Sequence, residues 1–258
     1  MRLFRGTRPL KRWRYVGVFG ERFMICAASV HVGPARQTFW AVFERERGAL
    51  IERTRLIPRR GALDLTPGRL RVRDDAVLLD LSLEEDDGIE ATCPSGRSYV
   101  WTRKQAGVHA RGTLVLDARP PVEIDALAVI DDTAGYHARV TEWWWAAGVG
   151  AGPDGTPLAF NLVQGVNDPQ CGSERAVWIA GVPHETPPVL FSTDLSAIAA
   201  DDGSELLFAP EAERSRRDNL LVLRSDYRAP FGTFSGTLPG AVPLAHAVGV
   251  VEHHRALW

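Results

Sequence analysis

Hydrophobic and polar residues alternate along this chain in short runs that end at turn residues. Clusters of Gly, Pro or Asp bound runs rich in β-branched and aromatic residues, such as Phe23–Val32, Val77–Leu83, Leu158–Val163 and Leu220–Arg224. No long stretch shows the period of an amphipathic helix, so the pattern predicts an all-β protein of many antiparallel strands. Helix is expected only in short pieces such as Pro210–Arg217, where a proline and two early glutamates suit a helix start.

Two parts of the chain, about 120 residues apart, have similar sequences. The turn Gly33-Pro34 recurs as Gly152-Pro153, and Gly112-Thr113-Leu114 recurs as Gly236-Thr237-Leu238. A period this long indicates a duplicated domain, because solenoid repeats are much shorter. We expect two tandem β-barrels or sandwiches, residues 1–120 and 121–258, joined by the proline-rich link 118–121. Apolar pockets are expected in the barrel mouths or between the halves.

The composition and the charge of the chain are those of an ordinary folded protein. The chain has 258 residues, with 30 basic and 32 acidic side chains and a formal net charge of −2, which gives no electrostatic reason to expect nucleic acid as a partner. The arginine-rich start, Arg2 to Arg14, is the local exception. It is interpreted as a solvated segment, with peripheral contact to a membrane surface or an anionic ligand as the alternative.

Several sequence features that are absent indicate the cellular location and argue against certain kinds of site. No apolar stretch approaches the length of a membrane span and the start has no signal-like apolar centre, so the cytoplasm is the expected location. The cysteines Cys26, Cys93 and Cys171 are odd in number and far apart, so neither a disulfide framework nor a zinc site is expected. Nucleophile-elbow and phosphate-loop motifs are absent as well.

The segment 131–145 is the strongest functional candidate. It begins with Asp131 and Asp132 and ends with three tryptophans. If the segment is extended, His137, Arg139, Trp143 and Trp145 share one face and Glu142 lies on the other. The first copy carries plain core residues, Met24 to Cys26, where the second has its tryptophans. The contrast favours an aromatic pocket in the second copy. The alternative is that the tryptophans simply fill the core of a barrel.

Three further groups of polar residues are candidates. Asn161 interrupts an apolar strand and either bonds a loop or faces a ligand. Asp226 lies between two arginines and next to Tyr227, which fits an ion-paired structural acid or a site acid. The run Glu252-His253-His254 suggests a metal site with His137, but adjacent side chains on a strand point to opposite faces, so no metal is expected.

The chain resembles a known family through motifs along its whole length. Lys11 to Val18, Trp101 to Gln105, the block from Gly135 to Gly150, Asn161 to Val163, Ser173 to Arg175 and Pro230 to Gly236 resemble the family called domain of unknown function 2804. Gly135-Tyr136-His137 followed by tryptophan is more distantly similar to tandem-lipocalin enzymes such as carotenoid 1,2-hydratase, tocopherol cyclase and fungal Diels–Alderases. That likeness implies two lipocalin-like barrels. The acid of the related motif and the histidine that follows it are replaced here by Ala138 and Arg139.

The functional hypothesis combines the residues with the resemblance. We expect an enzyme without cofactor or metal that cyclises, hydrates or isomerises an isoprenoid-like or polyene molecule by acid-initiated carbocation chemistry. The candidate catalytic residues are Asp131, Asp132, His137, Glu142 and Asp226. The candidate substrate-binding residues are Tyr136, Arg139, Trp143, Trp145, Asn161, Tyr227 and Phe231. The alternatives are a lipocalin-like carrier of an apolar metabolite, whose pocket needs no acid, and a partner-binding module with solid barrels. The sequence leaves the oligomeric state open.

Overall fold

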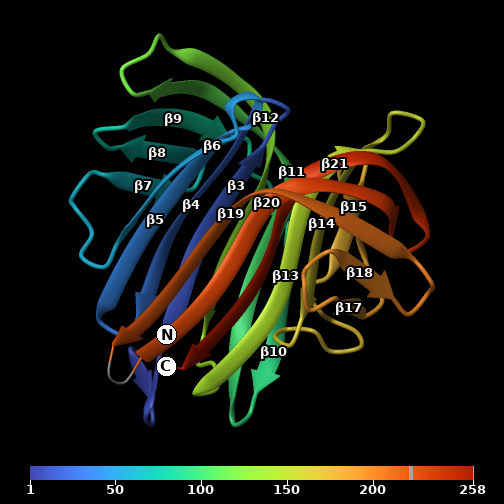
Figure 1. The fold of residues 1–258 in the computed structure, drawn as a ribbon. Coiled ribbons are helices and arrows are strands. Elements are labelled where there is room, and N and C mark those ends of the chain that lie inside the picture. Colours follow the sequence, from blue (N-terminus) through green and yellow to red (C-terminus); the bar gives the residue numbers. More distant parts are fainter. Residues whose placement is uncertain (221–222, 258) are drawn as a thin grey trace.

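The computed structural model describes residues 1–220 and 223–257, so the strand expected at Leu220–Arg224 includes two residues, 221 and 222, outside the described part. The fold is all-β, as predicted, and consists of two strongly curled antiparallel sheets that lie against each other (Figure 1). The only helical element among the described residues is the 3₁₀ turn Arg45–Arg47. A short hairpin, β1 (Phe4–Arg5) and β2 (Arg8–Pro9), precedes the first sheet.

The first sheet contains the strands of the first half of the chain. Its hydrogen-bonded order is β6-β5-β4-β3-β12-β11-β9-β8-β7, with β10 also paired to β11. The bounds are β3 (Lys11–Phe19), β4 (Phe23–Val32), β5 (Ala35–Glu44), β6 (Ala49–Arg55), β7 (Leu63–Thr66), β8 (Arg69–Arg73), β9 (Val77–Leu83), β10 (Ile89–Ser95), β11 (Ser98–Leu116) and β12 (Val122–Gly135).

The second sheet repeats this order. It runs β16-β15-β14-β13-β21-β20-β19-β18-β17. The bounds are β13 (Val140–Ala151), β14 (Pro157–Gln164), β15 (Ala176–Ile179), β16 (Val182–Glu185), β17 (Val189–Phe191), β18 (Ala197–Ala200), β19 (Glu205–Leu220), β20 (Leu223–Leu238) and β21 (Val242–Leu257). Strand for strand, β3 corresponds to β13, β12 to β21, and β11 to β20. The predicted internal duplication is therefore confirmed by topology.

Three sequence expectations differ from this arrangement. The sheets do not change at residue 120, because β12 pairs with β3 and β11 of the first sheet, and the chain crosses over only after Gly135. The division at 120 thus fits no boundary between sheets. The expected helix Pro210–Arg217 lies inside strand β19. The Gly33 and Gly152 turns join β4 to β5 and β13 to β14, which are not equivalent pairs.

The second sequence echo does match equivalent positions. Gly112 in β11 and Gly236 in β20 have φ values of +152° and +110°, a region that favours glycine. Gly112 lies opposite Leu81 of the adjacent strand β9, and Gly236 lies opposite Leu206 of the adjacent strand β19. The strands β9 and β19 occupy the same place in the two sheets. A Cβ at Gly112 would lie 2.0 Å from the carbonyl oxygen of Asp80, and one at Gly236 would lie 2.4 Å from that of Glu205.

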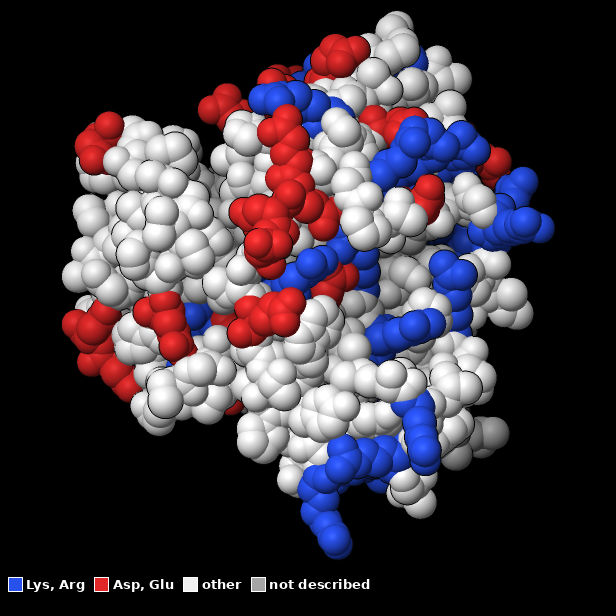
Figure 2. Space-filling model, turned by 180° about the vertical axis from the view of Figure 1, so that it is seen from behind, with Lys and Arg blue, Asp and Glu red and all other residues white. Residues whose placement is uncertain are grey.

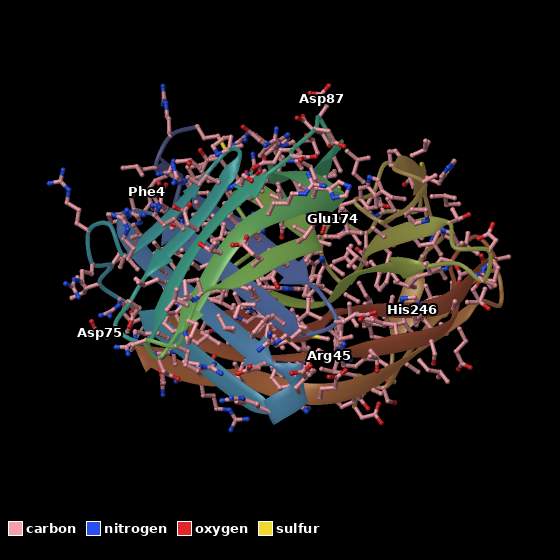
Figure 3. All side chains as sticks on the ribbon, turned by 90° about the horizontal axis from the view of Figure 1, so that it is seen from above. Phe4, Arg45, Asp75, Asp87, Glu174 and His246 are labelled. Atoms are coloured by element: carbon pink, nitrogen blue, oxygen red, sulfur yellow. The ribbon has the colours of Figure 1, made fainter. Side chains whose placement is uncertain are left out.

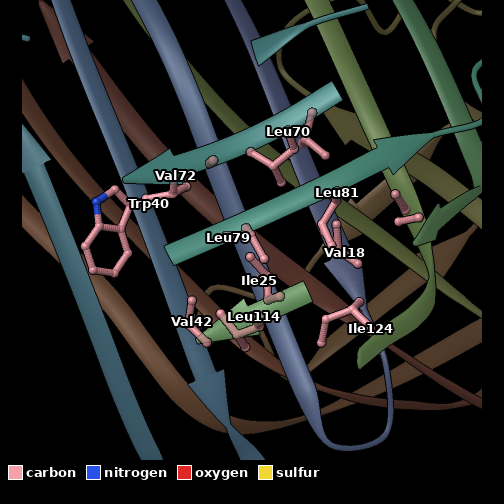
Figure 4. Close-up of a cluster of buried hydrophobic side chains, with 14 of the residues drawn as sticks. Val18, Ile25, Trp40, Val42, Leu70, Val72, Leu79, Leu81, Leu114 and Ile124 are labelled. Atoms are coloured by element: carbon pink, nitrogen blue, oxygen red, sulfur yellow. The ribbon is translucent and has the colours of Figure 1, made fainter. Parts of the chain in front are cut away.

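Each curled sheet encloses its own apolar core. In the first half, Leu70 and Val72 of β8 and Leu79 of β9 pack against Ile25 and other side chains of β3 to β5 (Figure 4). The second half has an equivalent interior around Phe160, Phe208 and Phe234. A third cluster joins the halves. It packs the outer faces of β3, β4 and β5 against β13, β20 and β21, and the candidate site continues from it.

Candidate functional site

An aromatic-lined pocket lies between the two halves and not inside the second one. It has a volume of about 280 Å³ and takes lining residues from β3, β4, β5 and β12 as well as from β13, β20 and β21. The expectation that the second half supplies most of the pocket is therefore corrected. Apolar side chains pack the interior of each curled sheet, and this pocket lies where the two halves meet.

Aromatic rings from equivalent strands form the walls of this pocket. Trp13 of β3 and Trp143 of β13 stack with their ring centroids 6.4 Å apart and their planes 7° apart. Two residues further along each strand, Tyr15 and Trp145 meet edge to face at 5.3 Å. Because Trp13 corresponds to Trp143 and Tyr15 to Trp145 in the duplicated topology, the pocket lies where the repeated elements face each other.

Each half pairs its tryptophan with a carboxyl group on the next strand. The indole nitrogen of Trp13 donates a hydrogen bond to Asp131 at 3.0 Å, and that of Trp143 donates to Glu252 at 2.9 Å. In β12, Asp131 lies two residues before the register partner of Trp13, and in β21 Glu252 lies two residues before that of Trp143. The two tryptophan–carboxyl pairs are therefore equivalent, and both carboxyl groups line the pocket.

The first carboxyl belongs to a buried ion cluster. Lys104 of β11 lies 2.7 Å from Asp131 and 3.2 Å from Glu174, and it is 2% exposed. Thr133 and Trp13 donate further hydrogen bonds to Asp131, and Asn167 donates one to Glu174. Burial opposes the charged ammonium, but the two carboxylates outweigh it and raise the pKa of Lys104. Figure 3 places Glu174 near the middle of the molecule.

The second carboxyl has no such cation. Among the described residues, no lysine or arginine forms an ion pair with Glu252. The basic side chain of these residues that approaches its carboxyl group is His254, whose Nδ1 lies 3.8 Å from Oε1. Burial raises the pKa of Glu252 to about 7, and the negative charge of Asp131 acts in the same direction. The hydrogen bond from Trp143 and the more distant positive charges of Arg214 and Lys104 lower this pKa in part. At neutral pH this carboxyl group is therefore protonated in a substantial fraction of molecules.

One residue difference between the repeats explains the contrast. Lys104 of β11 is the register partner of Asp131. In the second half, Arg228 pairs with His253 and Phe231 with Val250, so the residue opposite Glu252 in the same register is Ala229. Ala229 is apolar and buried. The duplicated site thus has one carboxylate held by an ammonium and one buried carboxyl opposite an apolar residue, which is the arrangement that separates an acid from a base.

Two histidines of the pocket are neutral. Burial, together with the charge of Lys11, lowers the pKa of His137 to about 3, with the backbone of Gly135 acting weakly in the other direction. Neither ring nitrogen of His137 has a hydrogen-bond partner of normal geometry among the described residues, and the ring lies 5.2 Å from that of Trp13. Burial likewise lowers the pKa of His254 to about 3.

A buried arginine closes the other side of the pocket. Arg214 of β19 binds Glu52 of β6 at 2.6 Å, which ties the two halves together. Its guanidinium also lies over the rings of Phe39 and Tyr227, at 4.4 Å and 5.6 Å. The hydroxyl of Tyr227 is buried without a hydrogen-bond partner among the described residues and lines the pocket, so it is free to meet a polar group of a ligand.

The structure brings five of the predicted site residues to the pocket: Asp131, His137, Trp143, Trp145 and Tyr227. Asn161 lies just behind them and accepts a hydrogen bond from the indole of Trp145 at 2.7 Å. Three predicted acids lie elsewhere. Asp132 binds Arg14 and Arg103, Glu142 binds His253 at 2.9 Å, and Asp226 binds Arg217 at 2.8 Å on the surface.

Three predicted binding residues also lie outside the pocket lining. Tyr136 is buried and donates to the carbonyl of Arg2, Arg139 is exposed, and Phe231 is packed between Phe19 and Phe43 in the cluster that joins the halves. His137 and Arg139 do not belong to the strand face expected from the sequence, because β13 begins only at Val140 and residues 136–139 precede it. Trp143 and Trp145 do share a face, and Trp144 points away to stack on His253.

Sequence reasoning did not propose Glu252 as an acid. It named Lys104, Glu174 and Trp13 only within the motifs that carry the family resemblance, and Arg214 only within the expected helix. One signal for Glu252 was present, because it follows Asp131 by about 120 residues, the period of the repeat. The family motif at residues 101–105 did not mark Lys104 as a site residue, because its partners come from β12 and from the loop before β15. Among the described residues, no group of three or more His, Cys, Asp or Glu side chains is arranged to hold a metal ion.

Comparison with known proteins places the chain in a family. Residues 69–258 match the family described as a domain of unknown function, DUF2804. The chain belongs to this family. No curated protein matches its sequence. The resemblance inferred from the sequence motifs is confirmed, and the family description itself names no activity.

Solved structures share the fold across almost the whole chain. A putative AttH from Nitrosomonas europaea is 13% identical, with a TM-score of 0.59, and the match covers 97% of this chain and 93% of that one. Kievitone hydratase from Nectria haematococca is 14% identical, with a TM-score of 0.60 and coverages of 94% and 88%. CghA is 9% identical, with a TM-score of 0.52 and coverages of 95% and 87%. At these identities the likeness establishes the tandem lipocalin-like fold alone.

Proposed function

We propose that this protein is an enzyme that protonates a double bond of an apolar, isoprenoid-like or polyene molecule and thereby hydrates, cyclises or isomerises it. The observation that carries the proposal is Glu252: a carboxyl group in an aromatic pocket, with its pKa raised to about 7 and no cation paired to it among the described residues. A pocket that only carries a ligand needs no such acid.

The chemistry assigns complementary roles to the two carboxyl groups. Glu252 gives its proton to one carbon of the double bond, whose π electrons form the new C–H bond and leave a cation on the other carbon. The faces of Trp13, Trp143 and Trp145 stabilise that positive charge. In hydration, the oxygen of a water molecule bonds to the cation, and the proton it releases passes to a carboxylate, either Asp131 or the now ionised Glu252.

Cyclisation and isomerisation need the same first step. In cyclisation a second double bond of the substrate attacks the cation, and in isomerisation a neighbouring carbon loses its proton to a carboxylate. The name of one protein with this fold, kievitone hydratase, fits the hydration route. The pocket volume of about 280 Å³ and its aromatic lining suit a flat or unsaturated small molecule.

The test begins with native mass spectrometry of the purified protein, followed by organic extraction and identification of any bound molecule. Wild-type protein and Glu252→Gln are then incubated with the extracted compound or with a panel of prenylated aromatic and polyene compounds. We expect wild type to convert a substrate, with hydration visible as a gain of one water, and Glu252→Gln to lose about 10²-fold or more in kcat.

Binding separates the outcomes. Glu252→Gln keeps the shape of the pocket, so it is expected to bind the compound as wild type does. Asp226→Asn, which changes a predicted acid on the surface, is the matched control and should leave turnover unchanged. A ligand that is bound but never converted would identify a carrier and overturn the proposed activity. Equal turnover by wild type and Glu252→Gln would overturn the assignment of the acid.

A further inference from the structure

One end of the molecule is basic, and the pocket opens there. We define this basic end as residues 1–12, 31–37, 55–60, 95–99 and 136–140. None of these segments contains an aspartate or a glutamate, although the chain as a whole has more acidic than basic residues. The net charge of −2 therefore conceals a strongly uneven distribution of charge over the surface.

Contacts between the segments show that they lie together. The amide of Leu10 donates to the carbonyl of Leu3, and the amide of Gly33 donates to the carbonyl of Leu10, both at 2.8 Å. The hydroxyl of Tyr136 donates to the carbonyl of Arg2 at 2.7 Å. The guanidinium of Arg5 lies 5.7 Å from the ring centroid of Tyr99. The start of the chain thus links the β4–β5 turn, the β10–β11 turn and the end of β12.

The opening of the pocket belongs to the same end. Of all residues that line the pocket, only Ala35, Arg36 and Leu56 are exposed. Arg55 of β6 is the register partner of Thr38 in β5, so Leu56 and Ile57, which follow it, lie beside the start of β5. A ligand that enters from solvent therefore passes these residues first.

Apolar side chains gather at this end as well. Six of the ten exposed large apolar side chains of the described residues lie in the basic end, namely Met1, Leu3, Phe4, Leu56, Ile57 and Val140. Single exposed apolar residues are ordinary on a protein surface, but their concentration around one opening is not. Ile57 is 88% exposed, so it contributes nothing to the packing of the fold.

The arginines around them are unpaired. Among the described residues, no carboxylate forms an ion pair with Arg2, Arg5, Arg36, Arg59, Arg60, Arg97 or Arg139. Figure 2 shows Lys and Arg side chains over the lower part of the molecule, the end at which both termini lie in Figure 1, with most Asp and Glu side chains above them. Unpaired arginines interspersed with exposed aliphatic side chains match a surface that is anionic outside and apolar beneath.

We propose that the basic end docks on an anionic lipid bilayer, with Leu56 and Ile57 inserted at the boundary between headgroups and acyl chains and the arginines among the headgroups. A bilayer accounts for both features, because aliphatic side chains find no partner on the phosphate backbone of a nucleic acid. The docked pocket opens directly onto the membrane, so an apolar ligand passes between lipid and protein without crossing water. The inference does not depend on catalysis.

Vesicle sedimentation tests the proposal with the full chain. Vesicles of phosphatidylcholine alone are compared with vesicles of phosphatidylcholine and phosphatidylglycerol mixed in equal parts. We expect binding to the anionic vesicles that weakens as salt rises, and much weaker binding to the neutral ones. Arg59→Glu/Arg60→Glu should weaken binding to the anionic vesicles by about tenfold or more, since each arginine near such a surface contributes substantially.

Matched variants separate location from general charge and hydrophobicity. Arg22→Glu/Arg47→Glu makes the same change of charge at exposed sites outside the basic end and should bind as wild type does. Ile57→Ser should weaken binding to the anionic vesicles, whereas Leu190→Ser, at an apolar side chain 62% exposed on the other half, should not. Thermal melting of each variant checks that the fold is intact.

Three results would overturn the proposal. The first is absence of binding to the anionic vesicles at low salt. The second is equal loss of binding in the two charge-reversal variants, which would mean that overall charge and not the basic end is responsible. The third is binding to an oligonucleotide that is as tight as vesicle binding and insensitive to Ile57→Ser, which would identify a polyanion site in place of a membrane surface.

Discussion

The indole rings of Trp13 and Trp143 stack across the pocket, 6.4 Å apart at their centroids, and each donates its N–H to a carboxyl group of its own half. The two rings occupy equivalent strands of a duplicated fold. Their carboxyl partners, Asp131 and Glu252, have diverged in surroundings: one holds Lys104, the other faces apolar Ala229 in the same register. The presence of a lysine in one half and an alanine at the equivalent position of the other thus separates an ion-paired carboxylate from an acid.

The two tryptophans provide a matched pair of variants. Trp143→Phe removes the N–H that hydrogen-bonds Glu252, a bond that lowers the pKa of this carboxyl group. We expect the pKa of Glu252 to rise further, by about one unit, because a hydrogen bond to a charged group is worth roughly 1.5 kcal/mol or more. The titration is followed by infrared difference spectroscopy of the protonated carboxyl band, with Glu252→Gln to assign it.

Trp13→Phe is the control for this measurement. Asp131 keeps Lys104 at 2.7 Å and Thr133 at 2.8 Å when the indole is removed, so the band assigned to Glu252 should titrate as in wild type. An upward shift of the same size in both variants would contradict the expectation, because it would come from a general change in the pocket and not from the lost hydrogen bond.

The raised pKa of Glu252 makes stability depend on pH. The folded state holds this proton up to about pH 7, whereas the unfolded chain releases it near the ordinary glutamate value of 4.5. Between these two values the folded state binds more protons than the unfolded state, so the free energy of unfolding falls as pH rises. The loss from this group amounts to about 3 kcal/mol by pH 8.

Urea unfolding of wild type and Glu252→Gln at several pH values measures this contribution. The difference in unfolding free energy, variant minus wild type, should become more positive between pH 5 and pH 8, since glutamine has no proton to lose. A difference that stays constant over this range would show that the carboxyl group titrates normally in the folded protein.

The buried ion cluster should be sensitive to loss of its cation. Lys104→Met removes the ammonium that faces Asp131 and Glu174 and leaves two carboxyl groups together in a buried site. We expect the free energy of unfolding at pH 7 to fall by about 3–5 kcal/mol, the usual cost of breaking a buried pair on one side. Chemical denaturation at pH 7 measures the loss.

The neighbouring residue supplies the comparison. Arg103→Met removes a partially exposed arginine from Asp132, which keeps its ion pair with Arg14, so the loss should stay below about 1 kcal/mol. If Lys104→Met is destabilised through unpaired carboxylates, its stability should recover in part at pH 5, where protonation relieves the repulsion. Stability that is equally low at both pH values would point to lost packing instead.

The sequence predicted the β-fold and the duplication correctly, because short alternating runs and similar segments about 120 residues apart can both be recognised along the chain. Trp143 and Trp145 were found by comparing the copies, although the equivalent strand of the first half is β3 and not β4. The helix expected at Pro210–Arg217 was wrong. In strand β19 the buried Arg214 lies between the exposed Glu213 and Ser215. Because the buried residue is charged, the sequence does not show the alternation of apolar and polar residues that is typical of a strand.

The acid of the site could not be assigned from a local pattern. Glu252 lies among polar residues, and its character depends on burial by Trp143 and on the absence of a cation at Ala229, which come from other strands. The same holds for Asp132 and Asp226, which looked as suitable as Asp131 but lie on faces where arginines neutralise them. Which face of a strand meets the other half is a property of the packing of two sheets.

The glycines of the second echo carry a final prediction about the duplication. Gly112 and Gly236 combine positive φ with a carbonyl oxygen of the adjacent strand where a side chain would begin, at 2.0 Å and 2.4 Å from an ideal Cβ. We therefore expect Gly112→Ala and Gly236→Ala each to lower the free energy of unfolding by more than about 2 kcal/mol. Gly155→Ala isolates the backbone contribution, because Gly155 also has positive φ but has no atom within 4 Å of an added Cβ, and it should cost about 1 kcal/mol. Denaturant unfolding of the three variants compares the costs. Losses at Gly112 and Gly236 no larger than that at Gly155 would mean that the strands shift easily at these points, and that the repeated glycines are not required by close contact between strands.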